Sequence, residues 1–314
     1  MNIVVLDKLH FSEENLERLR TIGNVTVHDD HPDTETAITR LADADIAIIG
    51  WTTLRRSNLD RLPRLKYISL ALTGFDIIDV EAARERGILV TNVPEYSRQS
   101  VAEYTFALAL SAIRHLRDLD AQVRAGNAIS PAENLLGHEL YRKTLGVLGV
   151  GSIGSWVARI GQGFGMQVIG HSRTHKDVPG VENVSLDDIL RRSDVLVLTL
   201  SVNPSSTGLL TRQRLALMKR GASLINIASN QLIDEQAVAD MLDSGHLGSA
   251  AFEDITHSGF DEGAVGSQSP LLHARNVVLS PQAGWFTVEA HDRLLDLTVE
   301  NVELYAAGTP RNVV

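Results

Sequence analysis

The feature that most constrains the fold is a glycine pattern, Gly149-x-Gly151-x-x-Gly154, which follows an apolar run and opens an amphipathic stretch. In a strand-turn-helix unit such glycines allow a tight turn, close approach of the backbone to a pyrophosphate, and close packing of helix on strand. The helix N-terminus adds unpaired N–H groups and a partial positive charge. The pattern predicts dinucleotide binding; the alternative is a glycine-rich turn that only packs. The residues expected to hold the dinucleotide here are Gly149, Gly151, Ser152, Ile153 and Gly154.

Short apolar runs alternate with amphipathic stretches along the chain, which is typical of parallel strands covered by helices on both faces. In the first third the expected strands lie at 2–6, 25–28, 45–50, 67–72 and 88–93. A second series lies at 143–151, 166–171, 194–200, 223–229, 248–254 and 276–282. The pattern predicts an α/β protein with two doubly wound parallel-sheet domains.

The helical stretches carry their own local signals. Ser12 and Asp33 stand where N-caps are expected, each just before an amphipathic stretch. A long helix is expected at about 98–125, followed by a Gly-, Asn- and Pro-containing loop that reads as a crossing between domains. A last helical stretch, 287–308, is expected to return to the first domain.

Composition bounds the class of protein. At 314 residues with 44% hydrophobic residues, the chain is long enough for two domains, each with its own core. A net charge of -10 argues against nucleic acid and anionic membranes as partners, and favours a small molecule. With no cysteine, disulfides and thiolate metal sites are excluded, and we expect no metal. No basic N-terminal region or membrane-spanning run is seen, so a cytoplasmic location is expected.

Cofactor choice is predicted from the end of the second strand of the glycine unit. An NAD-preferring fold places Asp or Glu there, about 20 residues past the motif, to accept from the ribose 2'-OH. This chain instead has Ser172, Arg173 and Thr174, followed by Lys176. A guanidinium can bind a 2'-phosphate through two charge-assisted hydrogen bonds. NADP(H) is therefore favoured; if Arg173 and Lys176 are only solvated charges, NAD(H) is used as well.

With these pieces in place, the chain resembles the D-isomer-specific 2-hydroxyacid dehydrogenases, which include glycerate, glyoxylate/hydroxypyruvate and phosphoglycerate dehydrogenases. The resemblance implies an oxidoreductase with a Rossmann nucleotide domain, 99–283, inserted into a flavodoxin-like substrate domain, 1–98 and 284–314. It also implies hydride transfer to a small carbonyl-type substrate and a homodimer joined through the nucleotide domains. The segments that carry the resemblance are 72–110, 139–154, 198–210, 224–235 and 276–290.

Several binding positions of the family are retained. The substrate turn is Leu72-Thr73-Gly74, whose backbone N–H groups are expected to form an anion-binding nest. At the nicotinamide end, Glu253 stands where the family has an Asp that accepts from the carboxamide. The resemblance also implies three further cofactor contacts, at Ser201, Ile227 and Ala228.

The catalytic trio of the family is not retained. Its arginine, which clamps the substrate carboxylate, is Ser229, and its histidine, which donates the proton, is Gln282. The glutamate that orients the histidine has no clear counterpart, which leaves Glu262 or Asp261 as candidates. A general acid supplies ~10²–10⁴ in rate, so ordinary 2-ketoacid reduction is expected to be slow.

Three hypotheses follow from these substitutions. The first is an NADPH-dependent reductase that acts on a non-standard substrate. The second is a conventional family enzyme in which other groups have taken over the old roles, although each substitute is more simply explained as a surface or packing residue. The third is a non-catalytic NADP(H)-binding sensor or interaction protein. The possible substitutes are Arg55, Arg56, Tyr96, Arg98 and His257.

Overall fold

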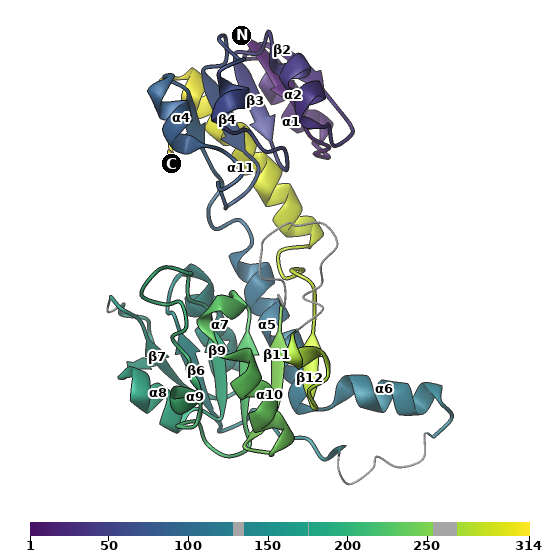
Figure 1. The fold of residues 1–314 in the computed structure, drawn as a ribbon, viewed down its shortest axis with the longest axis vertical. Coiled ribbons are helices and arrows are strands. Elements are labelled where there is room, and N and C mark those ends of the chain that lie inside the picture. Colours follow the sequence, from purple (N-terminus) through teal and green to yellow (C-terminus); the bar gives the residue numbers. More distant parts are fainter. Residues whose placement is uncertain (128–134, 175, 254–268) are drawn as a thin grey trace. The chain divides into compact units, whose positions relative to one another are not determined.

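A computed structural model describes residues 1–127, 135–174, 176–253 and 269–314 (Figure 1). The chain forms two compact units. Unit 1 contains Met1–Ser97 and Thr287–Val314, and unit 2 contains Arg98–Phe286. The C-terminal segment therefore belongs to the same unit as the N-terminal segment. None of the helices in the described ranges is long and apolar enough to cross a membrane.

Unit 1 is built on a five-stranded parallel sheet with the order β2-β1-β3-β4-β5. This is the flavodoxin-like doubly wound order. Strands β3 and β4 are buried on both faces, which explains why they read as continuous apolar runs. The strands are β1 (Asn2–Val5), β2 (Asn24–Val27), β3 (Ile46–Ile49), β4 (Tyr67–Leu70) and β5 (Leu89–Thr91).

The helices of unit 1 begin where the sequence indicates. The Ser12 side chain accepts from the N–H of Asn15, and the Asp33 side chain accepts from that of Thr36, so both predicted caps are confirmed. Arg18 in the first helix forms an ion pair with Glu303 in the last. The helices are α1 (Glu13–Arg20), α2 (Thr34–Leu41), α3 (Arg56–Leu59), α4 (Val80–Glu85) and α11 (Val288–Ala306).

Unit 2 is built on a seven-stranded parallel sheet with the order β12-β11-β10-β9-β6-β7-β8. Strand β8 was not predicted because it has three residues, Val-Glu-Asn, and no apolar run. Except for β7, the predicted strands run past the observed ends at the carboxyl side, where the chain enters loops. The strands are β6 (Thr144–Leu148), β7 (Gln167–His171), β8 (Val181–Asn183), β9 (Val195–Leu198), β10 (Ala222–Asn226), β11 (Leu247–Phe252) and β12 (Val277–Leu279).

The single long helix predicted at 98–125 is wrong, because the chain forms two helices there. His115 has a left-handed backbone with φ of 51°, which breaks the i to i-4 hydrogen-bond ladder between α5 and α6. The helices of unit 2 are α5 (Arg98–Ile113), α6 (Leu116–Arg124), α7 (Ser152–Gly163), α8 (Leu186–Arg192), α9 (Arg212–Leu215) and α10 (Glu235–Asp243). Short 3-10 turns lie at η2 (Asn230–Leu232) and η3 (Pro270–Leu272).

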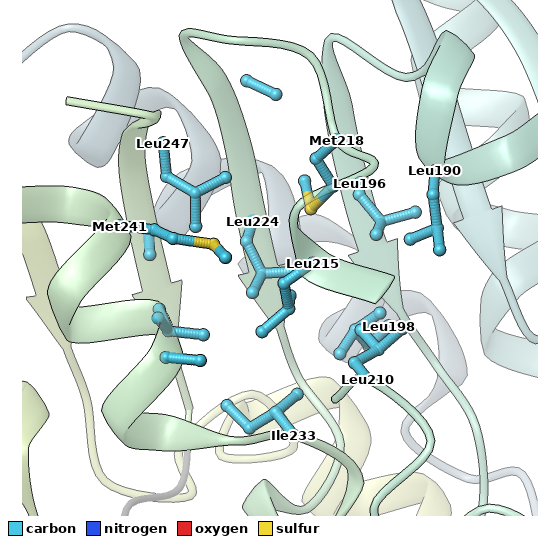
Figure 2. Close-up of a cluster of buried hydrophobic side chains, with 14 of the residues drawn as sticks. Leu190, Leu196, Leu198, Leu210, Leu215, Met218, Leu224, Ile233, Met241 and Leu247 are labelled. Carbon is cyan, nitrogen blue, oxygen red and sulfur yellow. The ribbon is translucent and has the colours of Figure 1, made fainter. Parts of the chain in front are cut away.

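Alternating residues of the unit 2 strands supply two hydrophobic layers. Leu196 and Leu198 face one side of the sheet, where Figure 2 shows them among side chains from α8, α9 and α10. Val195 and Val197 belong to the layer on the other side, with residues of α5 and α7. Both faces are therefore covered, and the loops at the carboxyl ends of the strands are left to form a site.

Candidate functional site

The first glycine of the loop holds a backbone turn. Gly149 has φ of +108°, and a Cβ there would lie 2.8 Å from the carbonyl carbon of Thr199. Its N–H donates to the carbonyl of His171 (2.8 Å), and its carbonyl accepts from Thr199 Oγ1 (2.6 Å). Only glycine satisfies both the backbone angle and the close approach. The turn is therefore locked between β6, β7 and the segment after β9.

The other two glycines serve opposite purposes. A Cβ on Gly151 would meet nothing within 4 Å, so the space in front of this residue is open. A Cβ on Gly154 would lie 2.2 Å from the carbonyl oxygen of Gly149, so this position is packed tightly. The three glycines thus provide the turn, the open approach and the helix-strand packing that a pyrophosphate-binding loop needs.

The residues at the start of α7 fit a bound diphosphate. Gly151 is the N-cap of this helix, and the first N–H groups of a helix have no intrahelical partner. Ser152 follows, and its buried Oγ has no hydrogen-bond partner in the described part of the chain. A phosphate oxygen would satisfy both the hydroxyl and the N–H groups, and the helix dipole favours its charge. The first prediction of the sequence, a dinucleotide cradle, has the required geometry.

Ser172 follows β7 and has a structural role beyond replacing an acidic residue. Its Oγ accepts a hydrogen bond from the N–H of Val150 (2.6 Å), which ties it to the glycine loop. Its hydroxyl proton is left for a further acceptor. Arg173 and Thr174 follow and are exposed. Among the described residues Arg173 has no hydrogen bond or ion pair, so its guanidinium is available to a phosphate.

The segment after β10 is organised by buried amides. Asn226 is fully buried, and its Oδ1 accepts from the N–H of Ala228 (3.0 Å). Its Nδ2 donates to Oδ1 of Asn230 (2.9 Å). Ile227 and Ala228 are half-buried, which leaves part of their surface for a ligand. Ser201, after β9, is exposed, and its carbonyl accepts from the Oγ of Ser206 (2.8 Å).

Ser229 is integrated into this segment. Its Oγ accepts from the N–H of Gln231 (3.2 Å) and caps the turn η2. The following Asn230 donates to Glu235 (2.8 Å), whose other oxygen accepts from Ser269 (2.7 Å). The loop is stabilised without a positive charge at residue 229.

Gln282 is exposed and makes no hydrogen bond within the described residues, yet its loop is firmly held. The Oγ of Ser100 donates to the carbonyl of Gly284 (2.5 Å), and Oε1 of the buried Glu253 accepts from the N–H of the same residue (2.6 Å). The hydroxyls of Tyr104 and Ser280 are hydrogen-bonded to each other. Helix α5 and Glu253, directly after β11, therefore fix the loop, and the side chain at 282 makes no hydrogen bond within the described residues.

Several candidates from the sequence have other roles or lie outside the described residues. Arg55 donates to the carbonyl of Asp76 (2.7 Å), and Arg56 pairs with Glu85. Burial raises the pKa of Tyr96 to about 12, so this phenol keeps its proton at neutral pH. The remaining candidates Asp261, Glu262 and His257 lie outside the described residues, and Arg98 begins α5.

The turn Leu72-Thr73-Gly74, predicted to bind a substrate anion, is held by hydrogen bonds to the residues after β5. Thr73 Oγ1 donates to the carbonyl of Val93 (2.9 Å), and the Thr73 carbonyl accepts from the side chain of Asn92 (2.6 Å). The carbonyl of Leu72 accepts from the N–H of Val93 (2.8 Å). Within the described residues, the N–H groups of Thr73 and Gly74 donate to nothing, and a Cβ on Gly74 would meet nothing. The turn offers these groups to an anion.

Comparisons with known proteins agree with this geometry. A family model described as D-isomer specific 2-hydroxyacid dehydrogenase, NAD binding domain, matches residues 106–284. A hydroxypyruvate reductase of Blautia hydrogenotrophica is 32% identical, covering 100% of this chain and 99% of the relative. A glyoxylate reductase of Aeropyrum pernix is 37% identical over 96% of this chain and 92% of the relative. A solved structure, an acyclic imino acid reductase in complex with NADPH and D-Arg, has a TM-score of 0.86 and 34% identity over 100% of both chains.

Proposed function

Because this chain belongs to the D-isomer-specific 2-hydroxyacid dehydrogenase family, we propose that it is an NADP(H)-dependent reductase of a small substrate other than the standard 2-ketoacids. The observation that carries the proposal is a contrast within unit 2. The nucleotide loop keeps every steric requirement for a dinucleotide, whereas the two family positions for clamp and acid hold the neutral residues Ser229 and Gln282.

NADP(H) is favoured over NAD(H) by the residues after β7. An acidic residue at Ser172 would accept from a ribose 2'-OH and repel a 2'-phosphate, but here the hydroxyl is followed by the uncommitted guanidinium of Arg173. Thr174 adds a further hydroxyl. The solved neighbour named as an acyclic imino acid reductase holds NADPH, which supports this choice and adds C=N compounds to the substrates to be tested.

The remaining family positions are assigned in the same way. We assign 99–283 as the nucleotide domain, with the nicotinamide end at Ile227, Ala228 and Glu253. The bound cofactor supplies a hydride. Residues of this chain would orient the nicotinamide. The buried Glu253 carboxylate would accept a hydrogen bond from its carboxamide, and the half-buried segment after β10 would pack against it. Glu262 stays a candidate for the orienting acid, and the N–H groups at Thr73 and Gly74 stay candidates for binding a substrate anion.

A homodimer through the nucleotide domain is proposed from helix α6. This helix contains no buried residue, and Leu116 and Val123, seven positions apart on one face, are each 60% exposed. An apolar stripe of this kind favours a protein partner, and a second copy is the partner that the family implies. In sedimentation experiments the double change Leu116→Asp and Val123→Asp should produce a monomer that still binds NADPH. A dimer that survives the change contradicts this interface.

The function is tested by two measurements on the same sample. Fluorescence titration gives the dissociation constant for NADPH, and stopped-flow absorbance then follows NADPH oxidation with a panel of ketoacids, aldehydes and imines. Tight binding with oxidation by at least one non-ketoacid is the expected result. Tight binding without any oxidation would instead favour the alternative, a non-catalytic NADP(H)-binding sensor or interaction protein.

A further inference from the structure

Three loops at the carboxyl edge of the unit 2 sheet lack positively charged side chains. The described segments after β9, β10 and β12, residues 199–209, 227–234 and 280–286, contain no Lys, Arg or His. The ionisable groups there are acidic: Asp234, which caps α10, and the adjoining Glu253, which is 4% exposed. Ser229 and Gln282 stand in these segments where the family has an arginine and a histidine. This part of the site is therefore neutral to negative.

Such an environment suits one kind of hydride acceptor better than another. Hydride addition to a carbonyl creates an alkoxide, which needs positive charge beside it and a proton donor. An iminium ion already carries its proton and its positive charge, and hydride addition removes that charge. It needs no general acid, and a neighbouring guanidinium or imidazolium would repel it. Each of the two substitutions removes a side chain that can carry positive charge. Both therefore make the site less suited to stabilise an alkoxide and better suited to bind a cation.

We propose that the substrate reduced by this protein is an iminium ion, the protonated form of a small imine. This inference rests on the proposed reductase function and names its substrate class. The hydride of NADPH forms the new C–H bond, and the C=N π pair becomes the lone pair of nitrogen. NADPH is oxidised to NADP⁺ and the iminium carbon is reduced to an amine, with no proton required from the protein.

The residue at 282 gives this proposal a specific hydrogen bond. An iminium N–H is a donor and needs an acceptor, which the carboxamide oxygen of glutamine supplies. A protonated histidine offers donors only. Because Ser100, Tyr104 and Glu253 hold the loop without using the Gln282 side chain, its oxygen is available for this bond. Gln282 is thus assigned as the acceptor for the substrate nitrogen.

The first experiment compares a carbonyl with the imine made from it. The whole protein is given NADPH with pyruvate alone, with pyruvate and methylamine, and with the cyclic imine 2-methyl-1-pyrroline. We expect oxidation of NADPH about 100-fold faster with an imine than with pyruvate alone, the low end of a general acid's rate contribution. Mass spectrometry should detect N-methylalanine. Oxidation with an aldehyde of the panel but with neither imine overturns the iminium inference and leaves the proposed reductase. Fast oxidation with pyruvate alone, or NADPH binding with no oxidation by any compound, overturns both.

Rates of imine reduction by variants, and their pH dependence, distinguish an effect of charge from a general loss of structure at the site. Ser229→Arg should lower the imine rate much more than Ser229→Ala, since only the first adds a positive charge. Gln282→Leu, which removes the acceptor, should be slower than Gln282→Glu, which keeps one. With wild type, kcat/KM should fall as pH rises through the pKa of whichever imine is used. A profile that stays the same when imines of different pKa are exchanged overturns the proposal.

A binding measurement gives a readout independent of turnover. The NADP⁺ complex is titrated by calorimetry with the ammonium product N-methylalanine and with the corresponding hydroxy acid, lactate. The ammonium compound should bind about 10-fold tighter, equivalent to ~1.4 kcal/mol. Ser229→Arg should reverse the order. Tighter binding of lactate to the wild-type complex contradicts a site for a cation.

Discussion

The two ends of the nucleotide site in unit 2 differ in what is retained. At the phosphate end, Gly149 and Gly154 leave no room for a Cβ, and Gly151 leaves open the space in which a pyrophosphate is expected. At the nicotinamide end the frame is kept, but the side chains at Ser229 and Gln282 are neutral. The difference teaches that backbone geometry protects the cofactor loop, whereas catalytic side chains on a fixed loop are replaced without disturbing the fold. This pattern is the one expected if the proposed change of substrate is correct.

The first prediction tests the phosphate end. Gly151→Val puts a side chain into the open space where the pyrophosphate is expected, so NADPH affinity should fall by about 100-fold or more, ~2.7 kcal/mol. Calorimetry measures the affinity, and circular dichroism checks that the protein is folded. Gly163→Ala, in the same helix with open space around its Cβ, is the matched control. Normal NADPH binding by the valine variant would mean that the loop is only a packing turn.

The second prediction restores the nicotinamide end to the family pattern. The double change Ser229→Arg and Gln282→His should raise kcat/KM for pyruvate, glyoxylate and hydroxypyruvate by ~10²–10⁴. The gain in kcat/KM should exceed the combined gains of the two single variants. The reason is that an arginine that binds the carboxylate and a histidine that donates the proton act as a unit. Steady-state kinetics of the four proteins measures it. If the wild type turns over these ketoacids at an ordinary rate, ~1–10³ s⁻¹, the nicotinamide end does not lack the groups needed for ketoacid reduction, and the prediction is wrong.

The third prediction concerns the cofactor 2'-phosphate. Wild type should bind NADPH about 10-fold more tightly than NADH, and Arg173→Ala should remove ~1.4 kcal/mol of this preference. Fluorescence titration with both cofactors measures the two constants. Arg191→Ala, an exposed cation in the last turn of α8, controls for the change in net charge. Equal constants for the two cofactors in wild type would defeat the prediction.

The smallest expected effect tests the support of the glycine turn. Thr199→Val removes the hydroxyl that donates to the Gly149 carbonyl (2.6 Å), so the free energy of unfolding should fall by ~1 kcal/mol. Urea denaturation measures the change, and NADPH affinity should weaken with it. Thr39→Val, which removes an exposed helix bond in α2, should change stability less. If the two variants behave alike, the turn does not depend on this hydroxyl.

Local patterns predicted most of the fold. The apolar runs located eleven strands, and Ser12 and Asp33 located two helix starts, because burial and capping leave a signal within a few residues. The same reasoning missed β8. This strand pairs with β7 through backbone hydrogen bonds, and its sequence contains no apolar run. The reasoning also missed the break at His115, because a single left-handed residue does not interrupt the apolar periodicity of 98–125.

The candidate site was predictable only in part, for a related reason. The glycine loop and the exchanged residues Ser229 and Gln282 are visible as short motifs. The supports of the second loop are not: Ser100 and Tyr104 contact Gly284 and Ser280 across 184 and 176 positions of sequence. An isolated Ser or Tyr in an apolar helix carries no mark of such a contact.

The hold on Gly284 has a consequence for laboratory evolution. Ser100 and Glu253 contact the backbone carbonyl and N–H of Gly284, and no described contact uses the side chain at 282. A saturation library at Gln282 should therefore express and fold across nearly all replacements, apart from proline, which would restrict the backbone. Selection on such a library would sample reaction specificity with little interference from misfolding. This position is a natural starting point for redesigning the catalyst.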